Sequence, residues 1–525
     1  MVNSACFPRI GETRYMQREP DAIEKLERSL SPERGSAANF YELAGLKLTA
    51  GDIDGAIAMY SKCLTFDSQN AAIYNNLGAA LIKAGRFAEA ITALERALGL
   101  QGGYQRALVN LGKALRESGR PFEALTRLRE ALALQPDYVP ALINLGDSLA
   151  ATGDMAGAQR ALERAVALAP SHAEAHMSLG IARLQAGRVE AALDSLHQAV
   201  ALAPGHADAH TNLAHALFCA GDWAGSWPHF EYRFQRHAQR APTRPPPHVA
   251  RWDGTATPPR ALWLVGEQGL GDQLQFARYA KVLQAEGVAC VIACEPRLVK
   301  LLEIAMPGVR VVPFDTAADE PAATRWTPLM SLPRWHATRL DTVPYPGGYL
   351  TADAQLIEHW RVRLPTGPRI ALAWAGNPRM ETGRYAGRSP PLAALAPLFR
   401  LANVNFISLQ RGSGEDQLDT VPFGRSIQRL TDLDSGPDAF LDTAAVLKSV
   451  DLLITPDTAI AHLAGGLGVP TWLCLMHEPD WRWMRQSMRT PWYTSLRLFR
   501  QPKPGDWTSV YLQVADELER WVARR

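Results

Sequence analysis

One stretch of this chain recurs at a fixed interval and decides much of the fold: residues 71–104 read AAIYNNLGAALIKAGRFAEAITALERALGLQGGY. Five glycines stand 34 residues apart, at Gly85, Gly119, Gly153, Gly187 and Gly221. Five leucines keep the same interval, at Leu77, Leu111, Leu145, Leu179 and Leu213. Such a period is typical of a solenoid of helix pairs, in which each unit buries its apolar face against the next. A solenoid of this kind binds other molecules, so any chemistry belongs to the rest of the chain.

The period is that of the tetratricopeptide repeat, and it predicts six helix pairs that start near residues 37, 71, 105, 139, 173 and 207. We assign the repeats to residues 37–240 and an N-terminal segment with a capping helix over residues 19–31 to residues 1–36. In the last unit, Trp223 and Trp227 replace the usual small residues. That change predicts a cap that docks on some other surface.

After a Pro- and Arg-rich linker over residues 241–260, short apolar runs alternate with helical patterns. Seven runs read as strands: 261–265, 289–294, 309–312, 370–374, 404–409, 452–455 and 471–475. This alternation predicts a parallel α/β architecture. The runs form two clusters, so we expect two Rossmann-like halves, 261–350 and 351–525, that face a cleft. An amphipathic closing helix, Ser509–Ala523, is expected to pack back across one half.

Composition excludes some partners of this 525-residue chain. Lys and Arg total 55 and Asp and Glu total 53, so no global charge favours a nucleic acid or an anionic membrane. The six cysteines are scattered, which favours a reduced, cytoplasmic protein. We find neither a signal peptide nor an apolar run long enough to insert into a membrane. The oligomeric state stays open.

The first motif with possible chemistry is GEQGLGD, residues 266–272, which follows the strand 261–265 and precedes a helical run. A glycine-rich turn at the carboxyl end of a strand lies where open α/β sheets bind ligands. Asp272 closes the motif. Its carboxylate can cap the helix by accepting a backbone N–H, or it can serve the site, and the two roles are compatible.

The second motif is LLITPDTAIAHLAGG, residues 452–466, in which a strand and a turn precede a helix that opens near Ala459. A helix N-terminus offers N–H groups and the positive end of a dipole, which suits a diphosphate. Thr458 is the expected phosphate ligand. Asp457 would repel phosphate unless it caps the helix or binds a sugar hydroxyl. His462 is either a core histidine or part of the site.

Arginines follow the neighbouring strands: Arg379, Arg384 and Arg388 after 370–374, and Arg411 after 404–409. Together they supply the local cation that a nucleoside diphosphate needs. Histidines at the i, i+4 spacing of a metal pair, such as His172 with His176, recur with the repeat, and the cysteines lack zinc spacing. We therefore expect no metal and no bound cofactor.

Several motifs, in order, resemble the bacterial glycosyltransferases of the heptosyltransferase type, glycosyltransferase family 9, in the form fused to tetratricopeptide repeats. The similarity runs through Glu267–Tyr279 (EQGLGDQLQFARY), Ser408–Gly412 (SLQRG), Pro456–Trp472 (PDTAIAHLAGGLGVPTW) and Pro479–Trp483 (PDWRW). The domain order is also similar to that of protein O-GlcNAc transferase. The resemblance implies a GT-B fold, an inverting and metal-independent reaction, and a donor nucleotide-sugar held mainly by the second half.

Within this fold we take Asp272 as the general base, with Glu267 in reserve, and we expect a donor site made of Arg388, Gln410, Arg411, Asp457, Thr458, Ala459 and His462. One asparagine per unit, at Asn76, Asn110, Asn144 and Asn212, is similar to the ladder that grips the backbone of an extended peptide in such solenoids. Consensus residues of the repeat explain these asparagines equally well.

The sequence thus predicts a cytoplasmic, inverting GT-B transferase that moves a sugar from a nucleotide-sugar to a protein Ser or Thr hydroxyl presented by the repeats. Two alternatives stay open. One is a transferase with a saccharide acceptor in envelope glycan synthesis, as in the heptosyltransferases. The other is a non-catalytic repeat scaffold.

Overall fold

The computed structural model describes residues 23–24, 26–27, 36–236, 249–254, 257, 259–314, 325–381 and 387–524. Most of the predicted capping helix over residues 19–31 and most of the predicted linker over residues 241–260 lie outside these ranges, as does Arg384. The chain divides into two compact units, Met1–Pro204 and Gly205–Arg525.

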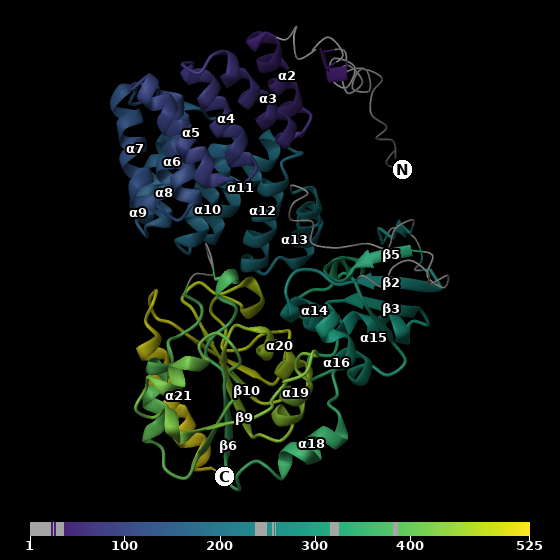
Figure 1. Cartoon of the computed structure of the whole chain (residues 1–525). Coiled ribbons are helices and arrows are strands. Elements are labelled where there is room, and N and C mark those ends of the chain that lie inside the picture. The colour runs from purple at the N-terminus through teal and green to yellow at the C-terminus, as the bar shows by residue number, and fades with distance from the viewer. Residues whose placement is uncertain are drawn as a thin grey trace. The chain divides into compact units, whose positions relative to one another are not determined.

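The described part of the first unit consists of helix pairs (Figure 1). The pairs are α2 (Ala37–Thr49) with α3 (Ile53–Phe66), α4 (Ala71–Lys83) with α5 (Phe87–Leu100), α6 (Gln105–Glu117) with α7 (Pro121–Leu134), α8 (Val139–Ala151) with α9 (Met155–Leu168), and α10 (Ala173–Gln185) with α11 (Val189–Leu202). A sixth pair, α12 (Ala207–Ala220) and α13 (Trp223–Phe230), belongs to the second unit. The six predicted starts of the pairs are confirmed.

Two glycines per unit explain the period physically. Gly85 lies in the turn between α4 and α5 with φ +74°, a left-handed conformation that favours glycine. Gly78, one residue after the periodic Leu77, lies against the partner helix: a Cβ built on it would stand 2.5 Å from Cγ of Leu94. The same close approach recurs at Gly112, Gly146 and Gly180. Helix pairing therefore depends on a missing side chain at this position.

The second unit contains two parallel sheets, each flanked by helices (Figure 1). The first has the order β1-β5-β2-β3-β4, with β1 (Ala250–Arg251), β2 (Ala261–Val265), β3 (Ala289–Cys294), β4 (Arg310–Pro313) and β5 (Arg325–Pro328). The second has the order β11-β10-β9-β6-β7-β8, with β6 (Arg369–Leu372), β7 (Asn405–Ser408), β8 (Ile427–Arg429), β9 (Leu452–Pro456), β10 (Thr471–Leu475) and β11 (Leu496–Arg500). The predicted α/β architecture is confirmed as two parallel sheets.

The helices of this unit follow the strands: α14 (Leu270–Phe276), α15 (Arg278–Ala285), α16 (Val299–Ala305), α17 (Leu332–Trp335), α18 (Ala354–Arg361), α19 (Leu441–Leu447), α20 (Ala459–Gly466) and α21 (Trp507–Val522). The closing helix α21 buries Tyr511, Val514 and Leu518 in one cluster with Leu372 of β6 and Ile454 of β9. The prediction that this helix packs back on one half is confirmed.

The sixth helix pair is anchored in the second unit by aromatic side chains. Trp223 and Trp227 are buried. The ring of Trp223 stacks on Trp492 with centroids 5.2 Å apart, and Phe218 of α12 stacks on Trp481 at 4.0 Å. Trp227 Nε1 also donates to the carbonyl oxygen of Thr338, 2.8 Å away. The prediction that these tryptophans mark a docking cap is confirmed.

Candidate active site

Two helix N-termini meet where the two sheets of the second unit present carboxyl ends of their strands. The turn after β2 leads into α14, and the turn after β9 leads into α20. Gly271 permits their close approach, because a Cβ on it would stand 2.8 Å from Cδ2 of His462 and 3.3 Å from Cα of Ala459. The fold therefore brings Asp272 and the start of α20 into one region, as the strand pattern predicts.

Asp272 lies in the first turn of α14, and both of its oxygens accept hydrogen bonds. Oδ2 accepts from the backbone N–H of Gly269 at 3.2 Å, and Oδ1 accepts from Nη2 of Arg482 at 2.7 Å. The side chain keeps 21% of its surface exposed. Burial raises the pKa of Asp272 above its ordinary value, although the charge of Arg482 opposes that shift. Asp272 thus caps its helix and still reaches solvent, so both predicted roles are compatible with its place.

Glu267, the reserve candidate for the base, lies in a buried ion pair. Its two oxygens accept from Nε and Nη2 of Arg233 at 2.8 and 2.9 Å. The backbone N–H of Met330 donates to the same carboxylate at 3.0 Å. Only 1% of the residue is exposed. The structure gives Glu267 contacts that tie the end of the sixth helix pair to the first sheet.

Thr458 is the N-cap residue of α20, and its side chain makes no capping hydrogen bond. Its Oγ1 lies 3.4 Å from Oγ1 of Thr455. A Cβ built on Gly376, after β6, would stand 3.3 Å both from Cγ2 of Thr458 and from Nη2 of Arg388. Thr458 and Arg388 therefore border one point beside the start of α20. A hydroxyl, a guanidinium and a helix N-terminus are the groups that bind a phosphate.

Asp457 precedes this N-cap and carries a perturbed carboxyl group. Burial, and then the nearby Asp480 carboxylate, raise the pKa of Asp457 to about 6 from an ordinary value of 3.8, while Arg388 and Arg482 oppose the shift. A carboxyl that holds its proton more tightly repels a bound phosphate less. With a pKa of about 6, the carboxyl is still mostly ionised at pH 7, so the conflict that the sequence predicts between Asp457 and a diphosphate is relieved only at acidic pH.

Replacement of Asp457 by Asn is expected to stabilise the protein by a few degrees in Tm near pH 7.5 and to leave Tm unchanged near pH 4. At about pH 4 and below, the carboxyl is largely protonated in the folded chain, so Asn mimics it. Above about pH 6 the carboxyl of Asp457 is ionised in both states, and the charge costs more free energy in the buried site of the folded protein than in the unfolded chain. Asn carries no charge, so it removes that cost. Thermal unfolding followed by tryptophan fluorescence tests this. An equal gain at both pH values would attribute the effect to shape rather than to ionisation.

Two predicted ligands of the donor, Gln410 and Arg411, lie in the loop after β7 and have different environments. Gln410 is buried, and its Oε1 accepts from the backbone N–H groups of Trp374 and Ala375, both at 2.9 Å. Its Nε2 donates to the carbonyl oxygens of Ala375 and Ser413 at 3.0 and 2.7 Å. The amide thus joins two loops at the strand ends. Arg411 is 45% exposed and has Glu415 Oε1 at 3.9 Å, which leaves its guanidinium accessible to an anion.

His462 lies in the packing between α20 and its surroundings. The ring is buried, and its Nδ1 lies 3.0 Å from the hydroxyl of Tyr493. Burial, with the charge of Arg482, lowers the pKa of His462 to about 3, so the ring is neutral at physiological pH. Its Cδ2 faces Gly271 of α14. Of the two predicted roles, this environment is the one expected for a core histidine.

The four asparagines of the predicted ladder are half-buried and bonded within the protein. In the first unit, Asn76 Nδ2 donates to the hydroxyl of Tyr41, Asn110 Nδ2 to Oδ1 of Asn75, and Asn144 Nδ2 to the carbonyl oxygen of Pro140. Asn212 lies in the second unit and donates to the carbonyl oxygen of Asp208. Oδ1 of Asn76 also accepts from Nδ2 of Asn75 at 3.0 Å, but an amide oxygen has two lone pairs, so each of these oxygens can still accept from a peptide backbone.

Sequence reasoning missed the residue that joins the two halves at this site. Arg482 lies in η10 (Trp481–Trp483), and Asp480 precedes it. The PDWRW motif contains both residues, but no local pattern shows that Arg482 reaches Asp272, which is 210 residues away. A buried arginine beside a buried aspartate is the only local signal, and burial is itself a consequence of the fold.

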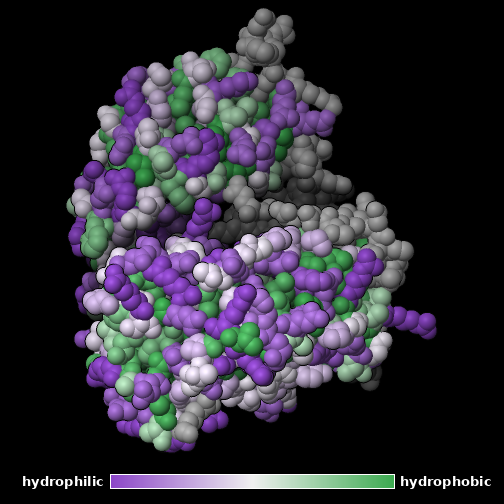
Figure 2. Space-filling view, turned by 60° about the horizontal axis from the view of Figure 1, so that its bottom comes forward, coloured by the Kyte–Doolittle hydropathy of each residue, from purple (hydrophilic) through white to green (hydrophobic). Residues whose placement is uncertain are grey.

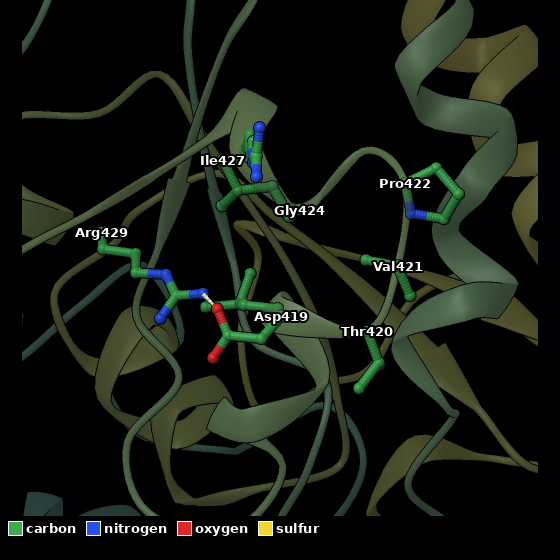
Figure 3. Close-up of a pocket in the computed structure, with 9 residues that line it drawn as sticks. Asp419, Thr420, Val421, Pro422, Gly424, Ile427 and Arg429 are labelled. Atoms are coloured by element: carbon green, nitrogen blue, oxygen red, sulfur yellow. Dashed lines mark hydrogen bonds and ion pairs between the residues drawn. The ribbon is translucent and has the colours of Figure 1, made fainter.

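A separate hollow lies at the edge of the second sheet (Figure 3). It has a volume of about 670 Å³ and is lined by residues between Leu418 and Arg429, from η8 (Glu415–Asp419), η9 (Gly424–Ser426) and β8. Asp419 and Arg429 form an ion pair there. Its lining includes none of the predicted site residues.

Two further observations concern metals and membranes. In the described ranges, no group of three or more His, Cys, Asp or Glu side chains could hold a metal ion. Hydrophilic and hydrophobic residues are interspersed on the face shown in Figure 2. Among the helices that the structure describes, none is both long and apolar enough to cross a membrane.

Comparison with known proteins identifies the repeats. Sequence models of the tetratricopeptide repeat match residues 49–85, 69–137, 104–171, 144–207 and 179–231. The N-terminal region therefore consists of tetratricopeptide repeats. The curated relative Protein FlbA, from Caulobacter vibrioides, is 28% identical over 333 residues, which cover 59% of this chain and 54% of that protein. The chain thus spans about half the length of this relative.

Parts of this chain are also similar to solved structures of repeat proteins. A thermophilic repeat protein from Thermus thermophilus is 23% identical, with a TM-score of 0.33, and the match covers 35% of this chain and 99% of that one. YrrB, described as a repeat protein with an unusual peptide-binding site, is 26% identical, with a TM-score of 0.26, over 36% of this chain and 95% of its own.

Proposed function

We propose that this chain is an inverting, metal-independent glycosyltransferase of the GT-B type, which moves a sugar from a nucleotide-sugar donor to a Ser or Thr hydroxyl of a protein bound by the repeats. One juxtaposition supports this most. Where the carboxyl ends of strands from two parallel sheets approach each other, a carboxylate on α14 lies near an anion-binding arrangement at the start of α20. Open α/β sheets bind their ligands at such an edge.

In this proposal, Asp272 accepts the proton of the acceptor hydroxyl as its oxygen attacks the anomeric carbon. The bond from that carbon to the diphosphate oxygen breaks at the same time, which inverts the configuration. A positioned base typically contributes 10²- to 10⁴-fold. Burial raises the pKa of Asp272, and that makes the carboxylate a better base than a free aspartate.

The leaving nucleoside diphosphate gains negative charge. Arg388, Thr458 and the N-terminus of α20 border one point, and the exposed Arg411 lies in the loop after β7 of the same sheet. Fixed donors aimed at developing charge are a strong source of rate enhancement, and they can replace a metal ion. Gln410 shapes this edge by holding the two loops together.

The direct test is to incubate the purified full-length protein with a panel of nucleoside-diphosphate sugars and to measure release of nucleoside diphosphate, with and without EDTA. We expect slow hydrolysis of one donor, unchanged by EDTA, and faster turnover when the acceptor protein is added. A repeat scaffold without catalysis releases nothing from any donor. A saccharide-acceptor enzyme hydrolyses a donor but glycosylates no protein.

Arg411→Ala and Thr458→Ala are each expected to raise the activation free energy of transfer by about 2 to 4 kcal/mol and to weaken binding of the nucleoside diphosphate. The reason is that each variant lacks a hydrogen-bond donor that stabilises the charge developing on the diphosphate. Calorimetry with the diphosphate and single-turnover rates measure the two effects. Arg429→Ala is the matched control, because Arg429 is similarly exposed, at 46%, and ends the adjacent strand β8. If both variants keep wild-type affinity and rate, the diphosphate binds elsewhere.

Replacing Asn76, Asn110, Asn144 and Asn212 together by Ala is expected to leave donor hydrolysis intact and to reduce transfer to the protein acceptor. The reason is that an amide oxygen accepts from a peptide N–H without reading the peptide sequence. Thr92→Ala with Thr126→Ala is the control, since both residues lie on the second helices of their pairs and away from the asparagine positions. Wild-type glycosylation by a quadruple variant that is folded by circular dichroism would remove the ladder from the mechanism.

A further inference from the structure

Arg482 makes three directed hydrogen bonds, and two of them join the two halves of the second unit. Its Nη2 donates to Asp272 Oδ1 and its Nε to Gln275 Oε1, both at 2.7 Å, and its Nη1 donates to Asp480 Oδ1 at 2.8 Å. Asp272 and Gln275 lie one turn apart on α14, whereas Asp480 belongs to the loop that carries Arg482. Only 7% of Arg482 is exposed. A planar guanidinium that satisfies three acceptors at once holds them in one geometry.

The contacts with Asp272 leave its carboxylate little rotational freedom. The backbone N–H of Gly269 holds one oxygen and Arg482 holds the other. A base must lie within about 3 Å of the proton it removes, and small misplacements reduce rates steeply. Because each oxygen has several acceptor positions, two donors fix the group without exhausting its capacity to take a proton.

The charge balance around Asp272 also depends on this arginine. A guanidinium beside a carboxylate stabilises its ionised form, which keeps the base deprotonated but weakens it. Asp480 shares the same guanidinium, so two carboxylates divide one positive charge. Burial raises the pKa of Asp272, and Arg482, with a smaller contribution from Arg388, opposes that rise.

Arg482 is itself supported by the sixth repeat. Its guanidinium carbon lies 4.7 Å from the ring centroid of Trp481, and that ring stacks on Phe218 of α12. Arg233 of η1 (Glu231–Gln235) also binds Glu267, which lies in the turn that precedes α14. The sixth helix pair thus braces both the loop of Arg482 and the turn that precedes α14.

We propose that Arg482 is a positioning residue for Asp272: it fixes the carboxylate of one half from the other half and sets the pH at which that carboxylate becomes a base. This inference rests on the proposed transferase function.

The test measures the pH profile of kcat/KM for Arg482→Gln and Arg482→Lys, beside Arg485→Gln as control. Arg485 lies in the same segment but pairs with Glu478 at 2.8 Å. In Arg482→Gln we expect kcat to fall about 100-fold and the acidic limb to move up by about 1 to 3 pH units, because a cation next to Asp272 is lost. Arg482→Lys keeps the positive charge but loses the planar guanidinium that donates to several acceptors at once. We therefore expect kcat to fall while the acidic limb of the pH profile stays in place.

Affinity for the nucleoside diphosphate, measured by calorimetry, should stay within about threefold of wild type in both variants, because Arg482 acts through Asp272. An acidic limb that moves in neither variant, or moves equally in both, overturns the inference. If Arg482→Gln fails to fold, an Arg482→Lys enzyme with wild-type kcat is sufficient to overturn it.

The proposed function can fail separately. A wild-type protein that uses no donor overturns both proposals. A wild-type enzyme that is active, with an inactive Asp272→Asn variant and unmoved Arg482 profiles, overturns only the role of Arg482.

Discussion

Asp272→Asn is expected to abolish sugar transfer, with kcat reduced by about 10²- to 10⁴-fold, and to leave affinity for the nucleoside diphosphate almost unchanged. Asn has the shape of Asp and its oxygen can still accept from Arg482, although its amide nitrogen cannot accept from the backbone N–H of Gly269. What Asn lacks is a basic oxygen for the hydroxyl proton. Rapid-quench measurement of single-turnover transfer, with calorimetry of the diphosphate, separates chemistry from binding.

The same variant decides between the candidates for the base. If turnover of Asp272→Asn stays within about tenfold of wild type, the base lies elsewhere and Glu267 becomes the next residue to replace. The contacts of Glu267 predict a different phenotype for that second experiment. Since both of its oxygens are engaged by Arg233, its replacement should change stability before it changes chemistry.

Arg233→Met is expected to destabilise the second unit by about 3 to 5 kcal/mol, because it leaves the carboxylate of Glu267 buried without its cation. The double variant Arg233→Met with Glu267→Met should regain most of that loss, since an apolar pair of similar volume needs no partner for a charge. All 14 tryptophans lie between Trp223 and Trp521, so denaturation followed by tryptophan fluorescence reports on this unit alone.

Arg236→Met provides the control for this cycle. Arg236 pairs with Asp208 at 2.6 Å, but 46% of its side chain is exposed, so its loss should change the free energy of unfolding by about 1 kcal/mol or less. A loss of that small size for Arg233→Met would mean that water reaches Glu267 and that the buried pair does not hold the sixth helix pair to the first sheet.

The sequence predicts central strands better than edge strands. The runs 261–265, 289–294 and 471–475 match β2, β3 and β10 at both ends, because strands covered on both faces are continuously apolar. β1, β8 and β11, which lie at the edges of their sheets, were missed, and so was the inner strand β5, whose sequence RWTP contains no apolar run. In β11, arginines alternate with apolar residues, and β1 has two residues, so neither carries the apolar run on which the prediction depends.

The sequence predicts those site residues that directly follow a strand. Asp272 and Thr458 each follow a strand whose end the sequence marks, and parallel sheets bring such ends to one edge. Gln410 shows the limit: its place after β7 is correct, but its amide is fully used between two loops, and hydrogen bonds between distant loops leave no local pattern. Arg482 was missed for the same reason.

The division of the chain between Pro204 and Gly205 determines how its modules can be exchanged. A C-terminal fragment that begins where the repeats end in sequence, after Phe230, would lack the partners of Trp481 and Trp492 and expose two large indoles. A fragment that begins at Gly205 keeps them covered. If the proposed function holds, foreign repeats fused before Gly205 would redirect sugar transfer to new proteins. In such a fusion the sixth repeat would have to be kept together with the C-terminal part of the chain.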